Sequence, residues 1–164
     1  MFPTFALALA ATVFAAPAPD STTLAFPWTG PGGARYWALR LKPGQDPRAE
    51  LLRFARARGL RAGFVASAIG SVTRASLRLA NQPGTSAREG HFEIVSLGGT
   101  LTRDGAHLHA SFADSTGAVF GGHLVDGSAV YTTAEIVIGE LSNAAFERET
   151  DPTYGYRELA PKRR

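Results

Sequence analysis

The chain has 164 residues, of which 45% are hydrophobic and 19% charged, a composition typical of one folded domain rather than a disordered segment. It contains no cysteine, which excludes a disulfide framework, a cysteine-based zinc or iron–sulfur site and a thiol nucleophile. The formal net charge of +3 comes from the closing Lys162, Arg163 and Arg164, because the other basic residues equal the acidic ones in number. Residues 161–164 are therefore predicted to be a basic tail.

Residues 1–16 are apolar and uncharged, and small residues precede a cleavage point after Ala15, as in a secretory signal peptide. The run is shorter than the about 20 residues of a membrane-spanning helix, so no membrane span is predicted. Cleavage of residues 1–15 would place the protein in the periplasm or outside the cell, and without cleavage it would be cytoplasmic. A second interpretation is an N-terminus with no targeting role. Residues 17–33, rich in Pro, Gly, Ser and Thr, are predicted to be a linker.

A strand and a helix are predicted at the start of the folded part. Over residues 35–41, the apolar Trp37, Leu39 and Leu41 fall on one face of an extended chain, an alternation typical of a strand. Asp46 is a favourable N-cap residue, and Gly59 suits the left-handed conformation that ends many helices. Apolar residues at helical spacing fill the interval between them. We therefore expect a helix over 47–58.

The rest of the chain is predicted to form strands separated by turns. The glycine pairs within these runs favour bulges or close backbone packing over a ligand site. Residues 81–90 are expected to be a polar loop, and the chain after Asn143 is expected to be irregular. The count is about seven strands and one main helix, an α+β fold with a mostly antiparallel sheet. The predicted strands after the helix cover 62–69, 73–80, 91–97, 98–102, 106–113, 118–124 and 128–141.

Three of the four histidines are candidate metal ligands. His107 and His109 are two residues apart in a predicted strand, so their side chains lie on the same face. His123 lies on the next strand and can face them across a turn. Three imidazoles form the ligand set of an open zinc-type site, so the predicted cofactor is zinc or another divalent metal. Glu135 or Asp114 could orient the imidazoles or act as a base. The alternative is that the three histidines have separate structural roles.

Basic residues predominate over 35–78 and acidic residues over 79–161. Within the basic part, Arg74 and Arg78 lie on one face of a predicted strand and are candidates for binding an anion. The alternative is that they form ion pairs with acids such as Glu93 or Glu135.

Four blocks of sequence, in this order, resemble the plants and prokaryotes conserved (PPC) domain. They are LKPGQDPRAELLRFARARGLRAGFV, AIGSVTRASLRLAN, FEIVSLGGTLTRDGAHLHASFAD and GAVFGGHLVDGSAVYTTAEIVIGEL. The resemblance places a PPC-like domain at 34–160 and implies an α+β fold and a homotrimer. In plants this domain occurs in AT-hook nuclear proteins, in which a separate hook with the core Arg-Gly-Arg-Pro binds DNA. This sequence lacks that core, so weak, non-specific nucleic-acid binding at most is expected.

Two functions are compatible with these patterns. The first is a non-catalytic PPC module that forms a homotrimer and binds an unknown small ligand or protein, within a family usually labelled DNA-binding. It agrees with the lack of a complete set of catalytic residues in any motif. The alternative is a metal-binding protein or a small metal-dependent enzyme that uses His107, His109 and His123.

Overall fold

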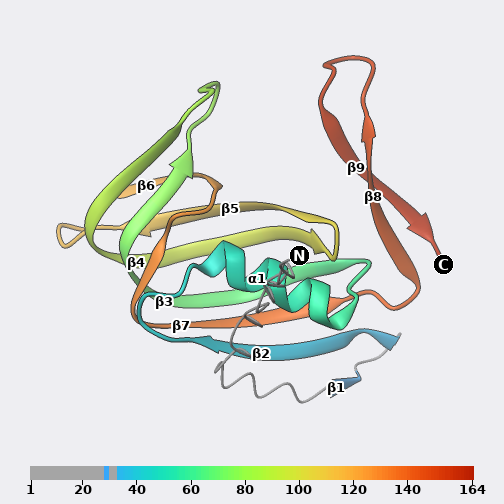
Figure 1. Ribbon diagram of the computed structural model, residues 1–164, viewed down its shortest axis with the longest axis horizontal. Coiled ribbons are helices and arrows are strands. Elements are labelled where there is room, and N and C mark those ends of the chain that lie inside the picture. The colour runs from blue at the N-terminus through green and yellow to red at the C-terminus, as the bar shows by residue number, and fades with distance from the viewer. Residues whose placement is uncertain (1–27, 30–32) are drawn as a thin grey trace, which may run out of the picture.

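A computed structural model describes residues 28–29 and 33–164 (Figure 1). The predicted signal peptide at 1–16 lies outside the described residues, as does most of the predicted linker at 17–33. Within that linker range, Trp28–Thr29 form a short strand, β1, which pairs antiparallel with β2 (Arg35–Leu41). No helix in the described part of the chain is long and apolar enough to cross a membrane.

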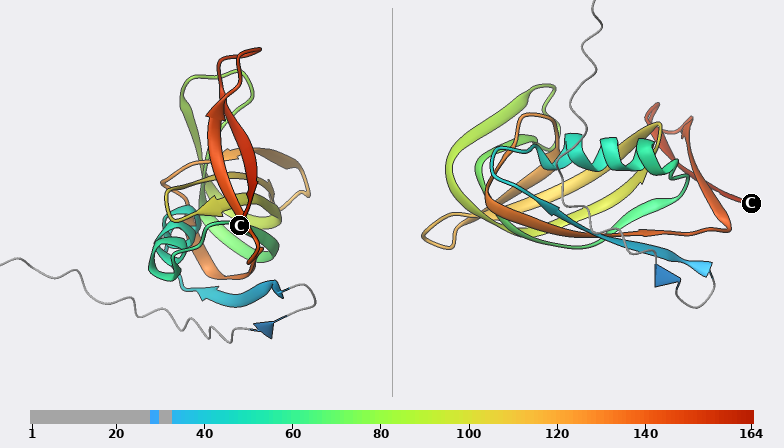
Figure 2. Two further views of the ribbon diagram at one scale, coloured as in Figure 1. Left: turned by 90° about the vertical axis from the view of Figure 1, so that its right-hand side faces the viewer. Right: turned by 60° about the horizontal axis from the view of Figure 1, so that its bottom comes forward.

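The predicted strand at 35–41 and helix at 47–58 are both confirmed as β2 and α1 (Pro47–Arg58). The carboxylate of Asp46 accepts hydrogen bonds from the first turn of the helix, and Gly59 ends the helix at φ 61°. Both caps satisfy backbone groups that a helix leaves unpaired at its ends. The apolar stripe of α1, which includes Leu51 and Phe54, is buried against the sheet (Figures 1 and 2).

Seven strands form one sheet in the order β1-β2-β7-β3-β4-β5-β6, and every pairing between described strands is antiparallel. The prediction of a mostly antiparallel sheet with one main helix is therefore confirmed. At its end, β3 pairs with β4 on one side and β6 on the other, so β3 to β6 close into a ring. The remaining strands are β3 (Gly63–Arg78), β4 (Thr85–Thr102), β5 (Gly105–Ala113), β6 (Val119–Leu124) and β7 (Ala129–Glu140).

Two predictions within this sheet were wrong. The predicted strand pairs 62–69 with 73–80, and 91–97 with 98–102, are each one continuous strand, β3 and β4. Bulges in β3 between Gly70 and Arg74 absorb the irregular residues without ending the strand. The strand β4 also begins at Thr85, inside the range predicted as a polar loop at 81–90.

The chain after Asn143 was predicted to be irregular, and this prediction was wrong. It forms a hairpin of β8 (Ala144–Thr150) and β9 (Arg157–Arg163). The hairpin projects away from the main sheet (Figures 1 and 2). Its base is held by a 2.8 Å hydrogen bond from the Phe146 amide to the Arg61 carbonyl. Most of the range predicted as a basic tail, 161–164, lies in β9.

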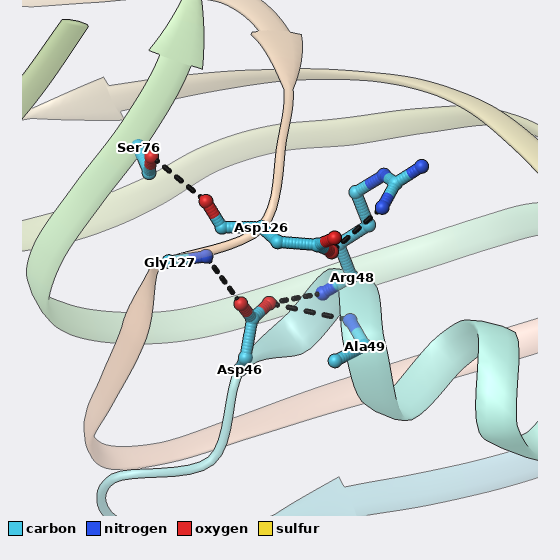
Figure 3. A network of polar contacts seen from close by, with 6 residues as sticks. All are labelled: Asp46, Arg48, Ala49, Ser76, Asp126 and Gly127. Atoms are coloured by element: carbon cyan, nitrogen blue, oxygen red, sulfur yellow. Dashed lines mark hydrogen bonds and ion pairs between the residues drawn. The ribbon is translucent and has the colours of Figure 1, made fainter. Parts of the chain in front are cut away.

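The start of α1 is tied to the turn between β6 and β7 (Figure 3). One carboxylate oxygen of Asp46 accepts from the amides of Arg48 and Ala49, at 2.9 and 3.3 Å. The other accepts from the Gly127 amide at 2.6 Å. Beside it, Arg48 forms a 2.6 Å ion pair with Asp126. A single carboxylate thus caps the helix and fixes the turn against it.

We expect Asp46→Ala to lower the free energy of unfolding by about 1–3 kcal/mol, since it removes an N-cap and the bond to the turn. Asp126→Ala is the matched control. It removes only an ion pair to an aspartate side chain that is 68% exposed, so we expect a loss of about 0–1 kcal/mol. Urea denaturation measures both. Equal losses in the two variants would contradict the role assigned to Asp46.

Candidate metal centre

The three histidines predicted as ligands lie on two neighbouring strands. His107 and His109 are on β5, where the alternating residues Leu108 and Ala110 are buried in the core. This alternation directs both imidazoles to the outer face. On β6, His123 is directly opposite His109 in the strand register. A tight turn joins the two strands and so places ligands from both on one surface.

The imidazole rings converge on a common point. Nε2 of His107 and Nε2 of His109 each lie 3.1 Å from Nδ1 of His123. One nitrogen from each ring lies within 4.8 Å of the other two. The predicted convergence of these residues is therefore confirmed.

This arrangement suits a cation better than it suits hydrogen bonding among the rings. Two ring nitrogens approach the same nitrogen of His123, whose single lone pair can accept only one good hydrogen bond. Three imidazole nitrogens, each 2.0–2.1 Å from a tetrahedral zinc ion, would lie about 3.3 Å from one another. The observed 3.1 Å separations are close to that value. The residues present therefore fit a divalent ion bound by three imidazoles.

The surroundings favour the neutral form of two of the rings. Partial burial, followed by the positive charge of Arg148, lowers the pKa of His107 below its ordinary value. Partial burial, followed by the charge of Arg78, lowers the pKa of His123 in the same direction. A metal binds the neutral imidazole, so both shifts reduce competition from protons near pH 7.

The β8–β9 hairpin completes the surroundings of the histidines. Nη2 of Arg148 donates to Oγ1 of Thr100 at 2.9 Å, and Nη1 lies 3.5 Å from Nδ1 of His107. An open cavity of about 380 Å³ lies between this hairpin and the sheet. Its lining includes His107, His109, Arg148 and Glu158. Sequence reasoning missed Arg148 and Glu158 because the hairpin that carries them was expected to be irregular.

Arg78, predicted as an anion-binding candidate, lies opposite His123 in the register between β3 and β6. Arg74, the second candidate for binding an anion, forms a 3.3 Å ion pair with Glu89. The structure thus brings one of the two arginines to the histidines.

Two other candidates lie elsewhere. Glu135 is on β7 between Arg40 of β2 and Ile69 of β3, and two strands separate it from β5. The carboxylate of Asp114 accepts hydrogen bonds from Thr116 and Ala118 and stabilises the turn after β5. The fourth histidine, His91, does not belong to the converging group, and its ring stacks on Tyr131 with centroids 4.2 Å apart.

Residues 29–142 match the model of the Plants and Prokaryotes Conserved (PCC) domain. Among curated proteins, the chain is 49% identical over 129 residues to the bifunctional protein GlmU of Synechococcus sp. strain JA-2-3B'a(2-13), covering 79% of this chain. It is 36% identical over 126 residues to AT-hook motif nuclear-localized protein 13 of Arabidopsis thaliana, covering 69% of this chain. The chain spans 20% and 28% of the lengths of these two relatives.

Two solved structures extend the comparison. A hypothetical protein from Salmonella cholerae-suis is 42% identical, with a TM-score of 0.79, and the match covers 84% of this chain and 99% of that one. The metal-containing protein AF0104 from Archaeoglobus fulgidus is 28% identical, with a TM-score of 0.65, and the match covers 84% of this chain and 98% of that one.

Proposed function

The chain belongs to the Plants and Prokaryotes Conserved domain family, and from this premise we propose that it binds one divalent metal ion through His107, His109 and His123. The observation that carries the proposal is the convergence of three imidazole nitrogens within 4.8 Å. A family relative of similar fold is described as metal-containing, which supports the same assignment. Membership in this family also confirms the resemblance drawn from the four sequence blocks.

Zinc is the ion that we expect. Imidazole suits zinc, copper, iron and nickel, and the chain has no thiolate that would select a softer ion. Zinc bound by three histidines keeps one coordination position for a further ligand. Such a site is compatible with a binding module, which is the function we propose. It is also compatible with the alternative function, a small metal-dependent enzyme.

The proposal is tested by loading the protein with zinc. Chelator-treated protein would be dialysed against zinc, washed free of unbound ion and submitted to elemental analysis. We expect one zinc per chain. A zinc content indistinguishable from that of a buffer blank would overturn the proposal.

We expect the zinc affinity to decline at a lower pH than it would in a site whose histidines all had the ordinary pKa of about 6.5. The sign follows from the lowered pKa values of His107 and His123. Because these two rings take up protons at a lower pH than free histidine does, protons compete less with zinc for them at a given pH. Competition with a coloured chelator at a series of pH values measures the effect. A loss of affinity that is already complete above neutral pH would contradict it.

We further propose that the protein assembles as a homotrimer, as the family resemblance implies. Exposed apolar side chains on the outer face of the sheet support an interface, since Ile69 is 59% exposed and Val137 lies nearby on the adjacent strand. Light scattering after size-exclusion chromatography is expected to give the mass of three chains. A clean monomer at micromolar concentration would contradict this prediction.

Nucleic-acid binding, by this proposal, is weak and depends strongly on salt. The Arabidopsis relative is named for its AT-hook, and the Arg-Gly-Arg-Pro core of such a hook does not occur in this sequence. Any residual affinity would come from clustered basic residues such as Lys162 to Arg164, whose attraction to phosphates is screened by salt. Residues 1–15 would direct export if they are cleaved, in which case the protein would not meet chromosomal DNA.

A further inference from the structure

Two arginines beside the histidines have no acidic partner among the residues that the structure describes. The ion pairs formed between described residues include Arg35, Arg48, Arg53 and Arg74, but neither Arg78 nor Arg148. Arg148 is partly buried, and within the described part of the chain its guanidinium has close polar contacts with the hydroxyl of Thr100 and the ring of His107. An unpaired guanidinium held against neutral groups is a strong site for an anion.

The positions of both arginines make the face of the histidines electropositive. Arg148 reaches His107 from β8, and Arg78 faces His123 from β3. The one acidic residue lining the adjoining cavity is Glu158. A bound divalent ion would add two further positive charges to this surface.

The space next to Arg148 can hold a small molecule. The cavity of about 380 Å³ that contains His107, His109 and Arg148 adjoins a second cavity of about 660 Å³. The second one shares Thr100, His107 and Arg148 with the first, and its lining also includes the acidic residues Asp104 and Glu147 and the basic Arg157. Cavities of this size are typical of small-ligand sites.

We propose that Arg148, assisted by Arg78, binds the carboxylate or phosphate group of a small molecule next to the three histidines. This inference rests on the proposed function, because the metal ion would supply a second contact for the same ligand. The guanidinium of Arg148 is held by Thr100, so its remaining donors are oriented before the anion arrives. The proposal therefore assigns the site to small acidic molecules rather than to neutral or cationic ones.

Isothermal titration calorimetry tests this with inorganic phosphate and, separately, with acetate, each added to zinc-loaded and to zinc-free protein. We expect at least one of the two anions to bind, and to bind more tightly when zinc is present. Arg148→Gln is expected to weaken binding roughly 10-fold to 100-fold in both forms, since it removes a charged hydrogen-bond donor. Glu158→Gln is expected to strengthen it, because the variant removes the negative charge from the cavity.

Arg56→Gln is the matched control, because Arg56 is an exposed arginine of α1 and does not line the cavity. It should bind the anions as the unchanged protein does. Elemental analysis of the same samples reports zinc uptake, so a failure of the metal site is seen independently of anion binding. The inference is overturned if neither anion binds to either form, or if Arg148→Gln and Arg56→Gln have equal affinities.

Discussion

Replacing His107 with alanine is expected to weaken zinc binding more than about 100-fold. The estimate is a lower bound, because changing a group that only supports a metal ligand already costs 10-fold to 100-fold in affinity. His107 lies outside the buried hydrophobic core, so the variant should unfold at nearly the same temperature as the zinc-free parent. Competition with a fluorescent zinc chelator measures the affinity, and thermal denaturation checks the fold.

The matched control for this prediction is His91→Ala. His91 is a histidine on β4 that stacks on Tyr131 and is absent from the converging group. Its removal is expected to leave the zinc affinity unchanged. Equal affinities in His107→Ala and His91→Ala would show that zinc is bound somewhere other than at the three histidines.

Replacing Gly99 with alanine is expected to lower the free energy of unfolding by about 2–5 kcal/mol. Gly99 has φ 134°, a conformation that other residues rarely adopt. A Cβ atom there would lie 2.0 Å from the backbone carbonyl oxygen of His107. Relief of this clash requires β4 and β5 to move apart, which would also displace the imidazole of His107.

Gly98→Ala provides the control, since it changes the neighbouring residue in the same way. A Cβ atom at Gly98 meets nothing within 4 Å, so we expect a change below about 1 kcal/mol. Urea denaturation compares the two variants. If Gly99→Ala is as stable as Gly98→Ala, the close approach of the two strands is not required for the fold.

The parts of the fold that could be predicted from sequence depend on local signals. Asp46 and Gly59 mark the two ends of α1, and both ends were predicted to the residue. The shared face of His107 and His109 follows from the two-residue period of a strand. The proximity of His123 to both could be predicted because only a short turn separates the two strands, β5 and β6.

The parts that could not be predicted depend on contacts between distant segments. Gly70 and the Gly98-Gly99 pair resemble chain breaks in the sequence, yet β3 stays paired with β7 at Gly70 and β4 stays paired with β5 at Gly98 and Gly99, so both strands continue through them. The hairpin of β8 and β9 lacks a clear apolar alternation, since most of its residues are exposed. For this reason Arg148 and Glu158 could not be assigned to the site before the fold was known.

X-ray absorption spectroscopy of the zinc-loaded protein tests the metal centre most directly. The account predicts a first shell that contains three imidazole nitrogens at 2.0–2.1 Å, together with the outer-shell scattering that imidazole rings produce. The spectrum of zinc-treated His107→Ala should no longer show three imidazole nitrogens in the first shell. A first shell made only of oxygen atoms, or one that is identical in the two proteins, would contradict the assignment of His107, His109 and His123 as the ligands.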